Sequence, residues 1–154
     1  MRIAAVLLAT ALIFAIACPV TGKGITVADE GIQKEAAKGF EQLLDLWRDG
    51  RYDELYDRTF GDGESRERFG ARLAAAPLKP ACCWEMMQDV KVSAGKGNRA
   101  TLKARIGLEG GVSGDSATRS FRLIKEDGVW KASRSEIISL SGATKKKKRL
   151  IRMR

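Results

Sequence analysis

The hydrophobic pattern of this chain changes its period once, near Pro80, and this change limits the possible folds more than any other feature. Before it, apolar residues recur every three or four positions, which is typical of amphipathic helices. After it, apolar and polar residues alternate, most clearly in residues 100–109, which is typical of a strand with one buried face. Helices that are followed by neighbouring strands predict an α+β domain.

Three helices are predicted before the change. The first begins at a capping box, residues 26–29, and ends at Gly50. Its apolar residues are Ile32, Ala36, Phe40, Leu43, Leu44 and Trp47. A second, shorter helix has one apolar side, formed by Tyr52, Leu55, Tyr56 and Phe60. A third helix begins after Ser65, which is a good N-cap, and ends before Pro77.

Four strands are predicted after the change, joined as an antiparallel meander. They are residues 84–92, residues 100–109, a segment that carries Phe121 and Leu123, and a segment that begins at Trp130. The dipeptide Asp127-Gly128, which favours a two-residue turn, joins the last two strands.

The first residues of the chain predict that it is exported. A positive residue precedes residues 3–17, in which Thr10 is the only polar side chain. At about 1.5 Å per residue this segment is too short to span a bilayer comfortably, so residues 1–18 are interpreted as a signal peptide. The small residue Ala17 before Cys18 resembles the end of a bacterial lipoprotein signal, which implies a lipid attached to Cys18. Cleavage by ordinary signal peptidase and an uncleaved anchor are the alternatives.

These features divide the chain into four parts. After the signal peptide, residues 19–27 form a tether, residues 28–141 form the folded α+β domain, and residues 142–154 form a basic, disordered tail. A lipid would hold the domain on a membrane in the periplasm, because several acyl chains make a stable anchor. Plain cleavage would leave the domain soluble in the periplasm or secreted.

The tail is a candidate membrane contact. Each Lys or Arg near an anionic lipid surface contributes about 1 kcal/mol to binding, and salt weakens this attraction. A solvated terminus without a partner is the alternative. The candidate residues are Lys145, Lys146, Lys147, Lys148, Arg149, Arg152 and Arg154.

Charge and composition exclude several classes of function. The formal net charge is +9, but residues 24–142 carry 19 basic and 19 acidic residues, so the folded body is neutral and a nucleic-acid partner is not expected. The chain has no histidine, which excludes Ser-His-Asp and Cys-His nucleophilic sites and histidine-based zinc sites. No metal and no cofactor are therefore expected.

Cys82 and Cys83 are adjacent, and three interpretations of the pair remain open. They are two small buried apolar residues, or they form a vicinal or intermolecular disulfide, which an oxidising compartment favours. They are otherwise two ligands of a soft metal, although two thiolates make only half of such a site.

Two stretches of the chain carry a resemblance to a known family. Residues 40–56 combine a predicted helix with the sequence Asp-Gly-Arg-Tyr at 49–52, and residues 125–131 read Lys-Glu-Asp-Gly-Val-Trp-Lys. With the Trp-led strand pair between them, they resemble the nuclear-transport-factor-2-like superfamily, and are similar to its bacterial exported members, many of them lipoproteins of unknown role. The resemblance covers about residues 28–140. It implies a curved antiparallel sheet wrapped around a long helix to form a cone, with a pocket at its open end.

Six side chains are candidates to line such a pocket: Tyr56, Trp84, Phe121, Trp130, Arg134 and Glu136. If Trp130 faces the core, alternation along one strand turns Arg134 and Glu136 the same way. The pair could then orient an anionic ligand at the mouth of the cone. The alternative is that the strand twists into solvent near its end.

The expected function is binding of a small ligand or a protein partner at the cell envelope, without catalysis. The superfamily ranges from isomerases and dehydratases to scaffolds, so the resemblance implies a fold rather than an activity. One alternative is a small-pocket enzyme of the isomerase or dehydratase type. Its parts would be Tyr52, Tyr56 and Asp57, together with Glu136 and Arg134. Another is a structural subunit that forms a homodimer through its open sheet face.

Overall fold

The structure is a computed structural model, and it describes residues 27–61, 63–110 and 115–143. The expected signal peptide with Cys18, nearly all of the tether, and the basic residues of the tail lie outside the described residues. Among the residues that are described, no helix is both long and apolar enough to cross a membrane.

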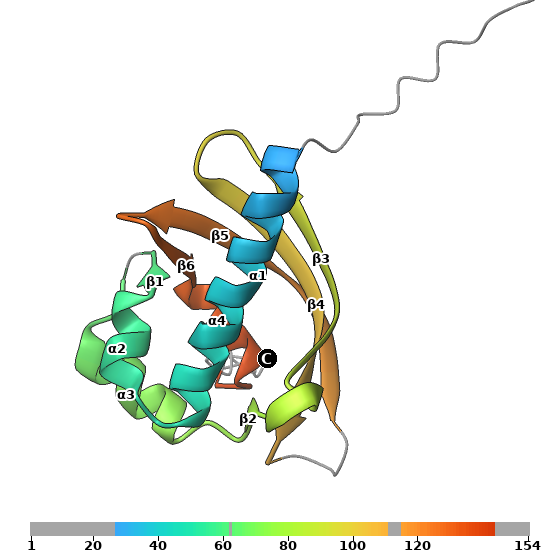
Figure 1. The fold of residues 1–154 in the computed structure, drawn as a ribbon. Helices are drawn as coiled ribbons and strands as arrows, with labels where there is room; N and C mark the ends of the chain where they lie inside the picture. Colours follow the sequence, from blue (N-terminus) through green and yellow to red (C-terminus); the bar gives the residue numbers. More distant parts are fainter. Residues whose placement is uncertain (1–26, 62, 111–114, 144–154) are drawn as a thin grey trace, which may run out of the picture.

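The predicted α+β class is confirmed. Five helical segments are described: α1 (Val27–Arg48), α2 (Tyr52–Asp57), α3 (Arg66–Ala74), the 3₁₀ turn η1 (Cys83–Glu85) and α4 (Arg134–Leu140). The described strands are β1 (Thr59–Phe60), β2 (Lys79–Pro80), β3 (Met87–Ala94), β4 (Arg99–Glu109), β5 (Ser116–Glu126) and β6 (Val129–Ser133). The long strands curl around α1 to form a half-barrel (Figure 1).

The sheet is mixed, which corrects the expectation of a purely antiparallel one. Its order is β1-β6-β5-β4-β2, and β3 also pairs with β4. The pairs of β3, β4, β5 and β6 are antiparallel, whereas the short strand β1 runs parallel to β6. Parallel strands need a long connection, and residues 61–128 separate β1 from β6.

The alternation predicted for residues 100–109 is confirmed in β4. One face of this strand is buried, and its side chains are Ala100, Leu102, Ala104, Ile106 and Leu108. The next hairpin also follows the sequence: Asp127 and Gly128 have φ angles of 51° and 77°, and positive φ at both central residues is what the preferred two-residue turn requires.

Helix α1 packs against the concave face of the sheet and supplies much of the core. Its largest buried side chains are Phe40, Leu43, Leu44 and Trp47. The ring of Phe40 lies 4.4 Å from that of Phe121 on β5, measured between centroids. Gly39 lets the helix approach β6, because a Cβ atom there would lie 2.7 Å from the Cβ of Trp130.

Two predicted boundaries are wrong because contacts distant in sequence set them. The second helix ends at Asp57, and Phe60, expected on that helix, lies in β1 beside β6. The strand expected from Trp84 begins only at Met87, because η1 comes first. Cys83 has a φ of 61°, a left-handed conformation that interrupts a strand.

The last predicted strand is also too long. It ends at Ser133, and Arg134 begins α4. Ile137 and Leu140 are both buried, and residues three apart face the same side only on a helix. The alternation that placed Arg134 and Glu136 on one strand face is therefore wrong.

Gly39→Ala is expected to destabilise the domain. In a helix interior alanine is otherwise more stable than glycine by about 1 kcal/mol. The added methyl group would meet the Cβ of Trp130, which is fixed to the backbone and cannot rotate away. The matched control is Gly31→Ala in the same helix, where an added Cβ meets nothing within 4 Å. This control is expected to raise the free energy of unfolding. Urea denaturation measures both variants, and stabilisation by both would contradict the close contact of α1 with β6.

Candidate functional site

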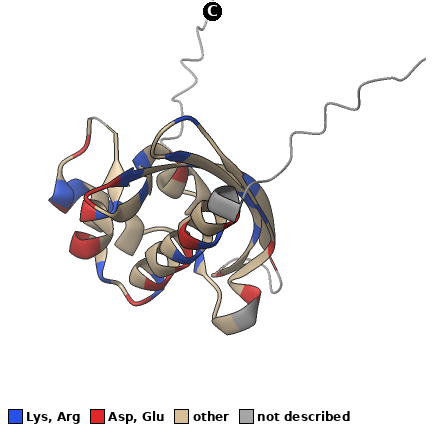
Figure 2. Cartoon of the chain, turned by 45° about the horizontal axis from the view of Figure 1, so that its top comes forward, with Lys and Arg blue, Asp and Glu red and all other residues tan. Residues whose placement is uncertain are grey.

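A cleft of about 470 Å³ opens where β1, α3, β5 and the start of α4 meet. Its walls are unusually rich in arginine for a domain whose body is neutral. The polar lining comprises Arg68, Arg72, Arg122, Arg134, Ser133, Ser135, Ser139 and Glu64. Figure 2 shows Lys and Arg along the long strands as well, so positive charge is not confined to this cleft.

Arg134 is the most buried charged residue of the cleft, with 9% of its surface exposed. Its Nε donates to the Oγ1 of Thr59 at 3.1 Å, and its Nη1 donates to the carbonyl oxygen of Glu64 at 3.3 Å. Its guanidinium lies 3.9 Å from the centroid of the Tyr56 ring. Within the described part of the chain, no carboxylate forms an ion pair with Arg134, so aromatic faces and neutral oxygens hold its charge.

Tyr56, whose ring packs against Arg134, is itself held by two contacts. Its hydroxyl donates to the carbonyl oxygen of Glu64 at 2.9 Å, and its ring meets that of Phe69 edge-on at 5.6 Å. Thr59 donates in turn to the carbonyl oxygen of Tyr56 at 2.8 Å. The tyrosine hydroxyl is thus engaged by the backbone, and the ring serves as a platform for Arg134.

Two of the other arginines form ion pairs with carboxylates, which compensate their charge. Arg72 donates to both oxygens of Glu64, at 2.8 and 3.0 Å. Arg122 donates to Glu136 from its Nε and from its backbone N–H, each at 2.8 Å. Arg68 forms no ion pair with a described residue.

Two positive charges therefore face the cleft without a partner carboxylate in the described structure: buried Arg134 and exposed Arg68. A second hollow, of about 490 Å³, lies beside the end of α1 and is also lined by arginines. There Arg48 pairs with Asp45 and Arg51 with Glu54, and Arg58 forms no ion pair with a described residue. The three arginines of this hollow are matched in number by three carboxylates, Asp45, Asp49 and Glu54. The excess positive charge distinguishes the first cleft.

Asp57, on the same helix as Tyr56, is also paired with an arginine. Arg66 donates to both oxygens of Asp57, and this hydrogen bonding lowers the pKa of the Asp57 carboxyl below its ordinary value. The guanidinium of Arg66 also lies over the Tyr56 ring, 5.2 Å from its centroid. The pair joins α2 to α3, which carry Tyr56 and Phe69.

Of the six predicted pocket residues, Arg134 lines the cleft. Tyr56 stacks on Arg134, and Glu136 pairs with Arg122, another residue of the lining. Phe121 instead packs in the core against Phe40, and Trp130 is buried beneath Gly39. The side chain of Trp84 lies outside the described part of the structure.

Sequence reasoning missed most of the lining of the cleft. Arg68 and Arg72 are four residues apart on α3, which places them on one helix face, and this spacing was the available signal. Arg122 and the three serines come from β5, β6 and α4, and only the folded chain brings these segments together.

The structure also decides among the interpretations of the adjacent cysteines. Cys82 and Cys83 are joined by a disulfide, and both residues are exposed. The interpretation of two buried apolar residues is therefore wrong. In the described ranges, no group of three or more Cys, Asp or Glu residues is placed to hold a metal ion.

Arg134→Lys is expected to lower the free energy of unfolding by about 1–3 kcal/mol. Lysine keeps the charge but loses the planar group that stacks on Tyr56 and the bond to Thr59. The matched control is Arg68→Lys on the rim of the same cleft, which is expected to change stability by no more than about 0.5 kcal/mol. Urea denaturation of both variants is the measurement. Equal effects of the two substitutions would show that the stack on Tyr56 contributes nothing.

Comparisons with known proteins name no family for this chain. No protein-family model matches it, and no curated protein matches it.

Proposed function

We propose that this chain is an exported, lipid-anchored domain of the cell envelope that binds a small anionic ligand in the arginine cleft. The observation that carries the proposal is the pair of uncompensated guanidinium groups, Arg134 and Arg68, that face one cleft. A cleft of about 470 Å³ lies within the range of small-molecule sites, which is roughly 300–1,000 Å³.

Because Arg134 is buried, water stabilises its charge only slightly, and a bound anion would compensate it. Removing a guanidinium from water is costly, and a ring face with two neutral acceptors offsets only part of this cost. In the described structure its Nη2 makes no hydrogen bond, whereas its Nε and Nη1 do. An anionic oxygen placed at Nη2 would gain a charge-assisted hydrogen bond, which is about twice as strong as a neutral one.

The serines give the cleft further donors for an oxygen-rich ligand. Ser133, Ser135 and Ser139 line it, and the hydroxyls of Ser133 and Ser135 are 3.0 Å apart. Hydroxyls can donate or accept, so they suit carboxylate, sulfate and phosphate oxygens alike. The site is thus suited to a small acid and leaves the particular acid open.

The fold is further proposed to be the cone of the nuclear-transport-factor-2-like superfamily. Three features support this: the long helix α1 inside the curl of the sheet, the order of helices before strands, and the tight hairpin between β5 and β6. The lining of the arginine cleft comes from β1, α3, β5, β6 and α4 and from the segment between β1 and α3.

Titration of the full chain with inorganic phosphate, sulfate and citrate at low ionic strength tests the ligand class. Binding of at least one is expected, with a fivefold to tenfold loss of affinity in Arg68→Gln, equivalent to about 1–1.4 kcal/mol. Lys34→Gln is the matched control, since it removes one positive charge from the exposed side of α1. No detectable binding of any of the three anions would contradict an anion site in the cleft. Equal losses of affinity in the two variants would contradict it as well.

The membrane anchor has its own test. Export and acylation are proposed from the apolar segment 3–17 and from Cys18 after Ala17. Cells grown with labelled palmitate are expected to label the wild-type protein and the Cys82→Ser variant but not Cys18→Ser, and globomycin is expected to block processing. An unlabelled, fully soluble wild-type product would contradict the proposed anchor. It would not bear on the proposed binding of an anion in the cleft.

A further inference from the structure

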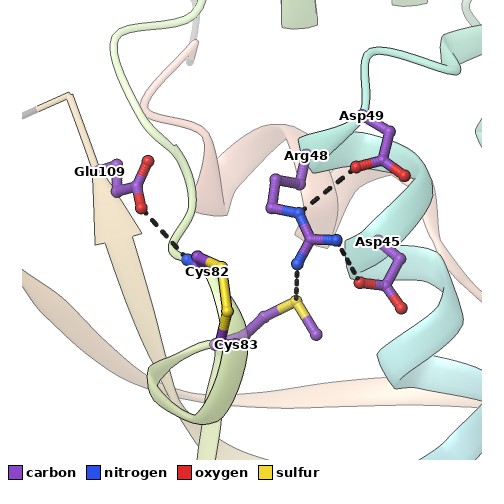
Figure 3. Close-up of a disulfide and its surroundings, with 7 residues drawn as sticks. Asp45, Arg48, Asp49, Cys82, Cys83 and Glu109 are labelled. Carbon is purple, nitrogen blue, oxygen red and sulfur yellow. Dashed lines mark hydrogen bonds and ion pairs between the residues drawn. A yellow bond between two sulfur atoms is a disulfide. The ribbon is translucent and has the colours of Figure 1, made fainter.

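The disulfide between Cys82 and Cys83 lies on the surface, in the segment that connects β2 to β3. Figure 3 shows it between Glu109 of β4 and the end of α1 that carries Arg48. Both cysteines are exposed, so a dissolved reagent reaches the sulfur atoms without any opening of the fold.

This bond has no structural role of the usual kind. A disulfide stabilises a protein mainly by restricting the unfolded chain, and the effect grows with the number of residues in the closed loop. A bond between neighbouring residues encloses no intervening chain. Because the pair is also exposed, it adds no packing to the core. The remaining explanation for this bond is the redox chemistry of its sulfur atoms.

Contacts on both sides fix the segment without help from the sulfur atoms. The N–H of Ala81 donates to the carbonyl of Gly107 at 2.9 Å, and the N–H of Cys82 donates to Glu109 Oε1 at 3.1 Å. Ala81 and Met86, which flank the exposed pair, are each 4% exposed. The segment is therefore anchored before and after the cysteines.

Gly107 shows how closely this segment lies on β4. A Cβ atom at that position would run into the carbonyl oxygen of Glu85, so only glycine permits the contact. The carbonyl of Cys83 accepts from the N–H of Met86 at 3.1 Å, which closes the turn on itself. After reduction, these backbone contacts would therefore still hold Cys82 and Cys83 in the same turn.

We propose that Cys82 and Cys83 form a reversible dithiol–disulfide site that exchanges two electrons with an external dithiol. A thiolate of the dithiol attacks one sulfur atom, a mixed disulfide forms, and the bond between Cys82 and Cys83 breaks. The second thiol of the reagent then attacks the mixed disulfide. The reagent leaves as a disulfide, and the protein has gained two electrons and two protons as two thiols. This site does not depend on the anion cleft.

Mass spectrometry of the full chain tests the proposal, with Cys18→Ser removing the third thiol. Native protein alkylated with iodoacetamide is expected to gain no group before treatment with dithiothreitol and two groups after it. Circular dichroism should be unchanged by reduction. Re-exposure to oxidised dithiothreitol should restore the unreactive form.

Single substitutions provide the matched controls. Cys82→Ser and Cys83→Ser, each with Cys18→Ser, are expected to gain one alkyl group whether or not dithiothreitol is present. Phenylarsine oxide bridges two thiols with loss of water, so it should bind the reduced pair one to one and bind neither single variant.

Three outcomes would overturn the proposal. Two alkylated thiols after oxidation would mean that no bond forms between the cysteines. A need for denaturant during reduction would mean that the bond is not accessible in the folded chain. A doubled mass under oxidising conditions would mean that the bond joins two chains.

Discussion

The burial of α1 in the curl of the sheet is the contact on which the other positions depend. Phe40, Leu43 and Trp47 are removed from water on one side of this helix, and burial of each such side chain contributes roughly 1.5–3 kcal/mol. Gly39 lets the helix approach β6 closely enough for Trp130 to cover it. With α1 fixed against β6, the short helices α2 and α3 can bring Tyr56 and Phe69 to the start of α4.

The parts of the fold that could be predicted are those with local signals. Strand β4 alternates along its whole length because only one face touches α1, and the turn at Asp127-Gly128 requires a backbone that few residue pairs adopt. The two-residue strand β1 has no such signal, because its pairing with β6 comes from the return of α2. Helix α4 has seven residues, too few to show a period.

The candidate site was predictable only in part, for a related reason. Arg134 and Tyr56 were both expected at a pocket, but Arg134 was placed there by a strand alternation that does not exist, since it is on a helix. No local pattern indicates that Arg122 lies near Arg134, because β5 and α4 meet only after folding. Arg68 also resembled an ordinary solvated residue of a helix surface. A charge becomes distinctive only when its lack of a neighbouring carboxylate can be seen.

The arginine cleft also responds to acidity differently from most ligand sites. A guanidinium keeps its proton at every pH that a living cell surface meets, and this chain has no imidazole to add or remove a charge near neutrality. Between about pH 6 and pH 9 the positive potential of the cleft is therefore constant. An acid that is fully ionised over this range would be held with the same strength throughout. If the cleft binds an anion as proposed, a change in pH would release only those ligands that take up a proton themselves.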